Sequence, residues 1–242
     1  MCTVTVIPIG NKIFIASNRD EKQKRKQALP PQKYIYNNAP LYFPKDADAG
    51  GTWIALKENS DAAVLLNGAF ENHLHQPPYR KSRGLIFLDI ISDDNPLKKF
   101  TEINLSNIEP FTIIILQGGS LYECRWDAEK HYQKKLDIHQ PHIWSSATLY
   151  SNQVIQKRSQ WFHQWLQQNN PPSQQQIFRF HHFGGDGDTH NDIRMNRNGQ
   201  MLTVSITCME ISNTHASMIY EDLTDETIHR ITATQSITVE TI

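Results

Sequence analysis

Residues 2–21 of the chain read CTVTVIPIGNKIFIASNRDE, and this stretch predicts a β-hairpin from which the rest of the fold can be built. Thr3–Ile7 and Lys12–Ala16 are rich in β-branched and aromatic side chains, which favour strands. The Gly-Asn dipeptide at 10–11 is typical of a two-residue hairpin turn. The position of this turn sets which residues of the two strands face each other.

Counting outward from the turn pairs Cys2 with Arg19, which places both side chains on one face of the sheet. A neighbouring arginine favours the thiolate form of a cysteine. Asp20, expected at the strand end, is placed to hold an α-amine. Methionine aminopeptidase removes Met1 when the next residue is small, so we expect the mature chain to begin with Cys2. An α-amine has a pKa of roughly 7.7–8.0 and can take the proton of its own thiol.

The composition excludes several classes of protein. The 242 residues are 38% hydrophobic and 20% charged, as in a globular protein, and the formal net charge of −1 gives no electrostatic basis for binding nucleic acid. No apolar run approaches the roughly 20 residues of a transmembrane helix, and the N-terminus lacks a secretory pattern. The spacing of Cys2, Cys124 and Cys208 predicts neither a disulfide framework nor a metal site. We expect a cytoplasmic protein without a cofactor, a metal or membrane insertion.

Hydrophobic periodicity predicts further elements along the chain. Strands are expected at Thr52–Leu56, Ala62–Leu66, Phe111–Leu116, Leu121–Trp126, Met201–Met209 and Met218–Tyr220, and helices after Ser82, at Pro96–Glu102 and at Gln153–Gln168. Lys22–Lys33 is expected as a long surface loop, because the segment is polar and strongly basic and is broken by prolines at 30, 31 and 40. Strands at both ends with helices between them predict one α+β domain over residues 1–242.

Several short segments resemble the NRDE family, which includes transport and Golgi organisation protein 2. The matching segments are Cys2 with Ser17–Glu21, Gly50–Trp53, Asn67, Ser82–Gly84 and Ser145–Leu149. The first block and the Gly-Gly-Thr-Trp block are specific in combination. The resemblance runs from residue 2 to about Leu223 and so covers most of the chain.

This family is similar to the N-terminal-nucleophile hydrolases of the penicillin V acylase and bile-salt hydrolase branch, which implies a four-layer αββα sandwich. By that likeness, Cys2 would be nucleophile and base, with Arg19 and Asp20 as its partners. Asn67, or the backbone N–H of Gly68, would contact the oxyanion, although Asn-Gly also favours a simple turn. The implied reaction is hydrolysis of a linear amide, or acyl transfer, on a small acyl or amide substrate.

Four more residues are expected at the substrate site, namely Asn18, Trp53, Arg83 and Ser146. Trp53 is predicted to be a core residue or a pocket wall, and Arg83 to follow a helix cap and to contact an anion. Ser146 departs from the family pattern, because relatives commonly have an asparagine there that serves the oxyanion hole or the nucleophile's amine. Loss of an oxyanion donor costs about 10²–10³ in rate.

The sequence leaves two other functions open. Some members of the resembling family are linked to haem handling and membrane trafficking, so a non-catalytic binding protein on the same fold, with haem as a candidate partner, is the main alternative. The segment Phe180–Asp192 holds three histidines and three aspartates, which makes cation binding a weaker alternative. The segment fits neither an EF-hand nor a zinc helix motif. We therefore expect a solvated Gly-rich loop there, acting as a lid, and expect 22–45 and 180–195 to line the pocket.

Overall fold

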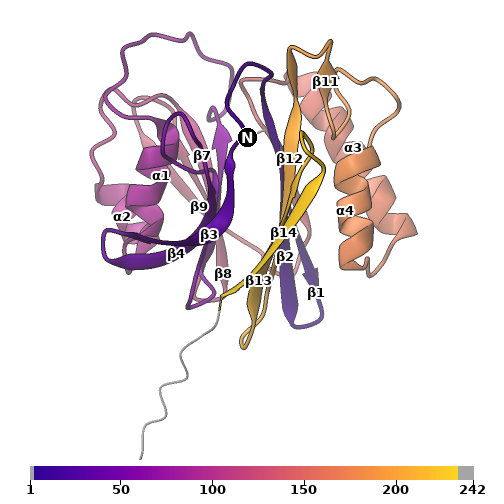
Figure 1. Cartoon of the computed structure of the whole chain (residues 1–242), viewed down its shortest axis with the longest axis horizontal. Helices are drawn as coiled ribbons and strands as arrows, with labels where there is room; N and C mark the ends of the chain where they lie inside the picture. Colours follow the sequence, from indigo (N-terminus) through magenta and orange to yellow (C-terminus); the bar gives the residue numbers. More distant parts are fainter. Residues whose placement is uncertain (1–2, 234–242) are drawn as a thin grey trace, which may run out of the picture.

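Two antiparallel sheets lie face to face in the middle of the molecule, and each is covered on its outer side by two helices (Figure 1). The structure is a computed structural model and describes residues 3–233. This layering confirms the predicted α+β class and the four-layer αββα sandwich. The helices of the described residues are α1 (Arg83–Ile91), α2 (Pro96–Glu102), α3 (Asn152–Gln168) and α4 (Gln174–Phe183).

The first sheet contains the N-terminal hairpin at its centre. Its strand order is β10 (His142–Ser145), β1 (Thr3–Ile9), β2 (Lys12–Lys22), β12 (Met201–Ile211), β13 (Ala216–Asp222) and β14 (Thr227–Ala233), with β11 (Asn196–Arg197) also paired to β12. Helix α4 packs against β2 and β12, and α3 packs against β10.

The second sheet is a meander in which each strand pairs with the next one in the chain. Its order is β3 (Leu29–Tyr36), β4 (Ala39–Lys45), β5 (Ile54–Lys57), β6 (Ala62–Asn67), β7 (Phe111–Gln117), β8 (Ser120–Trp126) and β9 (His131–Leu136). Helix α1 packs against β6 and α2 against β7. Because its middle strands are covered on both faces, residues 62–66 and 111–116 are buried without interruption, as their continuous apolar runs predict.

The register counted from the Gly-Asn turn is confirmed for every described pair of the first hairpin. Thr3 faces Asn18 at one end, and Ile9 faces Lys12 beside the turn. The predicted pair of Cys2 with Arg19 lies outside the described residues. Since side chains alternate along a strand, Arg19 faces the second sheet, whereas its neighbours in β2 face the layer of α3 and α4.

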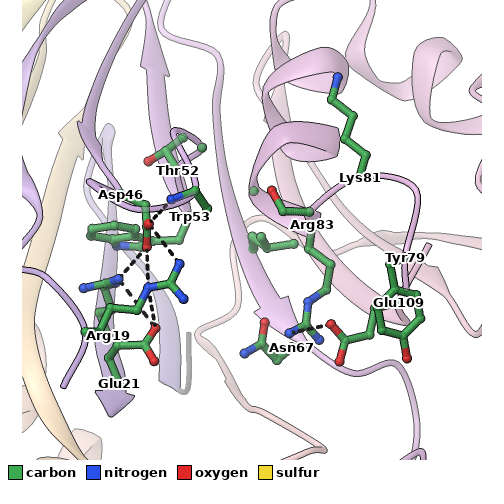
Figure 2. Close-up of a pocket in the computed structure, with 16 residues that line it drawn as sticks. Arg19, Glu21, Asp46, Thr52, Trp53, Asn67, Tyr79, Lys81, Arg83 and Glu109 are labelled. Carbon is green, nitrogen blue, oxygen red and sulfur yellow. Dashed lines mark hydrogen bonds and ion pairs between the residues drawn. The ribbon is translucent and has the colours of Figure 1, made fainter. Parts of the chain in front are cut away.

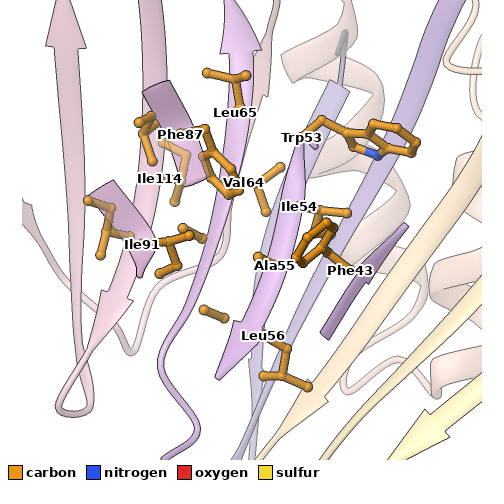
Figure 3. Packing of buried hydrophobic residues seen from close by; sticks show 14 of the residues in the cluster. Phe43, Trp53, Ile54, Ala55, Leu56, Val64, Leu65, Phe87, Ile91 and Ile114 are labelled. Carbon is orange, nitrogen blue, oxygen red and sulfur yellow. The ribbon is translucent and has the colours of Figure 1, made fainter. Parts of the chain in front are cut away.

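The main core fills the space around the second sheet. Figure 3 shows Phe87 and Ile91 of α1 in the same buried cluster as Val64, Ile114 and Phe43 of the strands. A smaller cluster under α3 and α4 contains Ile7, Phe14, Ala16, Phe162, Ile177, Phe180, Ile193 and Cys208. Both faces of the β1–β2 hairpin are therefore buried, which explains its strong apolar character.

Six strands of the described residues were not predicted, namely β4, which lies inside the second sheet and is mostly buried, β11, which pairs only with β12, and the four strands at the sheet edges. The edge strands are β3, β9, β10 and β14, and most of their side chains are exposed or half-buried. An edge strand buries little, so it lacks the apolar alternation that identifies a strand in sequence. The prediction of a loop over Lys22–Lys33 is wrong beyond Ala28, because β3 accommodates Pro30 and Pro31 at the edge, where a missing N–H is tolerated.

The predicted loop at Phe180–Asp192 is also partly wrong, because its first residues belong to helix α4. Ser173 caps that helix in a capping box with Gln176, whose side chain accepts from the Ser173 backbone N–H at 2.8 Å. This Ser-x-x-Gln pattern was the available sequence signal. The other helices agree with prediction, including the cap of α1 by Ser82. No helix among residues 3–233 is long and apolar enough to cross a membrane.

Gly51 and Gly84 bring two chain segments into backbone contact beside the start of α1. A Cβ on Gly51 would lie 2.5 Å from the carbonyl carbon of Gly84, and one on Gly84 would lie 2.9 Å from the Thr52 oxygen. The Thr52 N–H donates to the Gly84 carbonyl at 3.4 Å. The two glycine-containing blocks of the sequence therefore act together, each making room for the other.

We predict that Gly51→Ala destabilises the fold by about 2–3 kcal/mol, because the new methyl group meets rigid backbone on both the Gly84 and Leu85 sides. Urea unfolding measures this loss. The control is Gly119→Ala, which has φ +73° but no atom within 4 Å of the added Cβ, and should cost about 1 kcal/mol from backbone strain alone. Equal losses in the two variants would contradict the packing argument.

Candidate functional site

A cavity of about 410 Å³ lies where β2 of the first sheet faces the end of β6 and the start of α1. Charged and polar side chains dominate its walls. Those labelled in Figure 2 are Arg19, Glu21, Asp46, Thr52, Trp53, Asn67, Tyr79, Lys81, Arg83 and Glu109. The cavity therefore brings together Arg19, Trp53, Asn67 and Arg83, four of the residues predicted from sequence.

Arg19 forms the first wall. Its side chain is 5% exposed, and its Nη2 atom lies 2.8 Å from Asp46 Oδ2 and 3.5 Å from Glu21 Oε2. The guanidinium carbon lies 4.4 Å from the centre of the Trp53 ring, a cation–π contact that holds the side chain flat against the second sheet. Arg19 thus bridges the two sheets, because Asp46 follows β4.

Asp46 organises this wall, although the sequence analysis did not identify it. Its carboxylate accepts from Arg19, from Arg25 and from the backbone N–H groups of Asp48 and Ala49, at 2.7–3.2 Å. Burial alone would raise the pKa of the Asp46 carboxyl, but the Arg25 hydrogen bond, the Ala49 N–H and the two arginine charges lower it overall. The sequence signal was an aspartate opening an Asx-type turn before two glycines.

Arg83 and Glu109 form the opposite wall (Figure 2). Arg83 Nη2 lies 3.0 Å from Glu109 Oε2, and Nη1 donates to the carbonyl of Pro110 at 3.3 Å. The other oxygen of Glu109 lies 3.2 Å from His73 Nε2 and 3.3 Å from His75 Nδ1. One carboxylate therefore holds both Arg83 and the segment before α1. Glu109 is a second residue that sequence reasoning missed.

Asn67 lies beside Arg83 at the end of β6, and its side chain faces the cavity (Figure 2). The backbone N–H of Gly68 donates to Pro110 at 3.0 Å, so the suggested use of that N–H for an oxyanion is wrong. Ser146 is fully buried, does not line the cavity, and donates from Oγ to the Asn67 carbonyl at 2.9 Å. Ser146 therefore contacts the backbone that carries Asn67.

Asp20 faces away from this cavity, and it lies within β2 rather than at the strand end, which corrects the prediction. Tyr150 donates a hydrogen bond to its carboxylate at 2.9 Å and Thr203 does so at 2.6 Å. The ring of Tyr150 in turn makes a cation–π contact with Arg158, whose guanidinium carbon lies 3.9 Å from the ring centre. This buried cluster fixes the Asp20 carboxylate on the α3 side of the sheet.

Asn18 is also on that side, in contact with α4 rather than with the cavity. Its amide donates to the carbonyls of His181 and Ile193 at 3.0 and 2.9 Å, and its oxygen contacts His181 Nδ1. Thr5 Oγ1 lies 2.8 Å from His181 Nε2. Burial, with the nearby charge of Arg158, lowers the pKa of His181 to about 3, so the imidazole is neutral.

The predicted lid does not lie over the cavity. None of the described residues in 180–195 lines it, and Asp186 instead pairs with Lys157 of α3 at 2.6 Å. From the predicted 22–45 region, Arg25 reaches the cavity. Residues 3–233 contain no group of three or more histidine, cysteine, aspartate or glutamate side chains arranged to hold a metal ion.

The two cysteines of the described chain are unsuited to nucleophilic chemistry. Cys124 and Cys208 are buried, and burial raises the pKa of each thiol to about 12. The predicted nucleophile, Cys2, lies outside the described residues.

Comparison with known proteins identifies the family. The model of the family described as Transport and Golgi organisation 2 matches residues 1–237. The chain belongs to this family. No curated protein sequence matches it significantly.

Solved structures share the fold of this Transport and Golgi organisation 2 family member at low identity. The Caenorhabditis elegans N-acylethanolamine-hydrolyzing acid amidase ortholog aligns with a TM-score of 0.58 and 13% identity, over 86% of this chain and 92% of that one. Two variants of the conjugated bile acid hydrolase from Clostridium perfringens align with TM-scores of 0.61 and 0.59 and identities of 11% and 10%, each over 96% of this chain and 92% of that one. These N-terminal-nucleophile hydrolases share the αββα sandwich.

We predict that Asp46→Asn destabilises the protein by about 2 kcal/mol at pH 7, because two arginines lose their nearest charged partner. A carboxyl whose pKa is lowered by folding adds stability above its unfolded pKa, near 3.8, and that stability is lost as the pH falls through the folded value. The difference from wild type in urea unfolding should therefore shrink as the pH falls below about 3.8. Asp48→Asn, at a more exposed neighbour, is the control, and a pH-independent difference would contradict the assignment.

We also predict that His181 stays neutral from pH 8 to pH 5. Its folded pKa of about 3 lies below the ordinary value of 6.5, so protonation favours the unfolded state as the pH falls below 6.5. The NMR signal of the His181 imidazole should not shift over this range, whereas free histidine amide in the same tube should titrate. A His181 titration midpoint above pH 6 would contradict the buried network.

Proposed function

We propose that this protein is an N-terminal-nucleophile amide hydrolase that uses Cys2 after removal of Met1. The observation that carries the proposal is the cavity wall at Arg19. The hairpin register confirmed for residues 3–18, if continued by one pair, would place Cys2 opposite that residue on the face that lines the cavity. The fold shared with N-terminal-nucleophile hydrolases supports the same assignment.

The reaction follows from a cysteine that carries its own α-amine. The amine takes the proton of the Cys2 thiol, and the thiolate sulfur attacks the carbonyl carbon of a linear amide. Collapse of the tetrahedral intermediate breaks the C–N bond, and the amine product leaves with the proton. Water, deprotonated by the same α-amine, then hydrolyses the thioester and releases the acid.

Arg19 supplies the charge that favours the thiolate. It is buried and held by Asp46 and Trp53, so its guanidinium is fixed in position before any substrate binds. The Asp46 carboxylate offsets part of the positive charge of Arg19. Arg19 therefore acts on the thiolate as a partly neutralised cation. We assign Asp20, fixed by Tyr150 and Thr203 on the other side of β2, to holding the α-amine.

Asn67 is the candidate oxyanion donor, because its amide faces the cavity across from Arg19 (Figure 2). Ser146 stands where the family resemblance implies an asparagine, and its hydroxyl donates to the Asn67 carbonyl at 2.9 Å. We assign Ser146 to positioning the strand end that carries Asn67. The reaction then depends on Asn67 as its one assigned side-chain oxyanion donor.

The names of the structural neighbours agree with this class of reaction. One is an amidase that hydrolyses N-acylethanolamines, and the other is a hydrolase of conjugated bile acids. One of the bile acid hydrolase structures is a mutant in which the cysteine at its second position is replaced by alanine. The present chain also has its cysteine at the second position.

We predict that the purified protein lacks Met1 by intact mass, and that Cys2→Ala abolishes hydrolysis of activated acyl amides. Asn67→Ala should lower kcat by about 10²–10³, because one oxyanion donor is lost. Asn152→Ala, at an exposed asparagine of α3, is the matched control and should keep wild-type kcat. Retention of Met1, or wild-type turnover by Cys2→Ala, would refute the proposed function.

A further inference from the structure

The walls of the cavity carry an unusual amount of charge for a site that would bind an acyl group. Four cationic side chains line it, namely Arg19, Arg25, Lys81 and Arg83, against the three carboxylates of Glu21, Asp46 and Glu109. The apolar and aromatic side chains in its lining are Leu65, Ala49, Trp53 and Tyr79, and Arg19 covers one face of Trp53. A long apolar chain would have to remove water from these charges without replacing its hydrogen bonds, which costs several kcal/mol.

The charges on the two walls are not equivalent. Arg19 and Arg25 share Asp46 and Glu21, and Arg25 also lies 3.8 Å from Asp48, so both arginines are offset by carboxylates. This group of charges is tied to the backbone of the turn at 48–49 and has the structural role of joining the sheets. Lys81 lines the cavity, but its charge is paired with Asp89 of α1, which does not line the cavity.

Arg83 differs because its carboxylate partner is shared. Glu109 Oε2 meets the guanidinium at 3.0 Å, while Oε1 is in contact with the imidazoles of His73 and His75. The pair is largely buried, with 17% of each side chain exposed. Glu109 therefore holds Arg83 against the cavity, while its own charge is divided among three partners.

From this arrangement we infer that the site takes an amide whose acyl or amine part carries one carboxylate, and that Arg83 is the residue that selects it. Hydrolysis of this amide depends on the proposed function, whereas binding of its carboxylate at Arg83 does not. A guanidinium matches a carboxylate with two parallel N–H···O bonds, and here the incoming group would share Arg83 with Glu109. Glu109 is then a positioning residue that orients the guanidinium.

The charges of the cavity lining also favour a ligand with one negative charge over a ligand with two. Lys81 is offset by Asp89 outside the lining, so the other three cations of the lining face three anions, and every negative charge that a ligand adds is in excess of that balance. A phosphate dianion would add two such charges to a cavity lined by Glu109, Asp46 and Glu21, and like charges repel. A carboxylate is thus favoured over a phosphate ester.

The test uses matched amides that differ only in this charge. Glutaryl p-nitroanilide is compared with its methyl ester for the acyl side, and butyrylglycine with butyrylglycinamide for the amine side. Wild-type kcat/KM should favour the carboxylate at least about tenfold in one pair, and Arg83→Gln should remove that preference, as expected for a charged hydrogen bond. Arg83→Lys should restore part of it. Arg80→Gln, an exposed arginine that does not line the cavity, is the matched control and should change neither member of a pair.

Binding to Cys2→Ala separates this inference from the proposed function. Calorimetry with the same pairs should show tighter binding of the carboxylate, and Arg83→Gln in the Cys2→Ala background should remove the difference. Selective binding without turnover in the wild type would refute the hydrolase and support the carboxylate site. Turnover or binding without a preference in either pair, or an equal loss for both members in Arg83→Gln, would overturn the role of Arg83.

Discussion

The ion pair between Arg19 and Asp46 is the interaction on which the site depends. Arg19 comes from the central hairpin of the first sheet, and Asp46 from the turn that follows β4 of the second. The two residues lie 2.8 Å apart in a region where unpaired charges would be costly. The pair therefore fixes the spacing of the sheets at one end, and the cavity exists because this end is filled by polar groups rather than by apolar side chains.

How far the fold could be predicted depends on burial. The hairpin at 3–18, the apolar strands at 62–66 and 111–116 and the helix at 153–168 are recognisable because each buries a continuous or periodic apolar face. The four edge strands bury too little to produce such a pattern. Helix α4 was missed for a different reason, since its helical signal is a capping box and its buried face includes the polar residue His181.

In the site, residues that lie in short sequence motifs could be predicted, whereas residues whose partners are distant in sequence could not. Arg19, Trp53, Asn67 and Arg83 could be found because they lie in short recognisable blocks. Asp46, Arg25 and Glu109 could not, because their roles come from partners 21 to 36 positions away that the meander brings together. Asn18 and Asp20 were placed with Arg19 by proximity in sequence, although strand alternation puts them on the opposite face.

The alternation of side chains along β2 explains why one short stretch of this strand contacts both the second sheet and the helix layer. Arg19 faces the cavity, while Asn18 and Asp20 lock the same strand to α4 and to the segment before α3 through His181 and Tyr150. A shift of β2 by one residue would exchange these faces, burying Arg19 under the helices and turning two polar side chains toward the core. The neutral His181 network on one side and the charged pair on the other therefore define a single register. The position of the candidate catalytic residues is a consequence of that register.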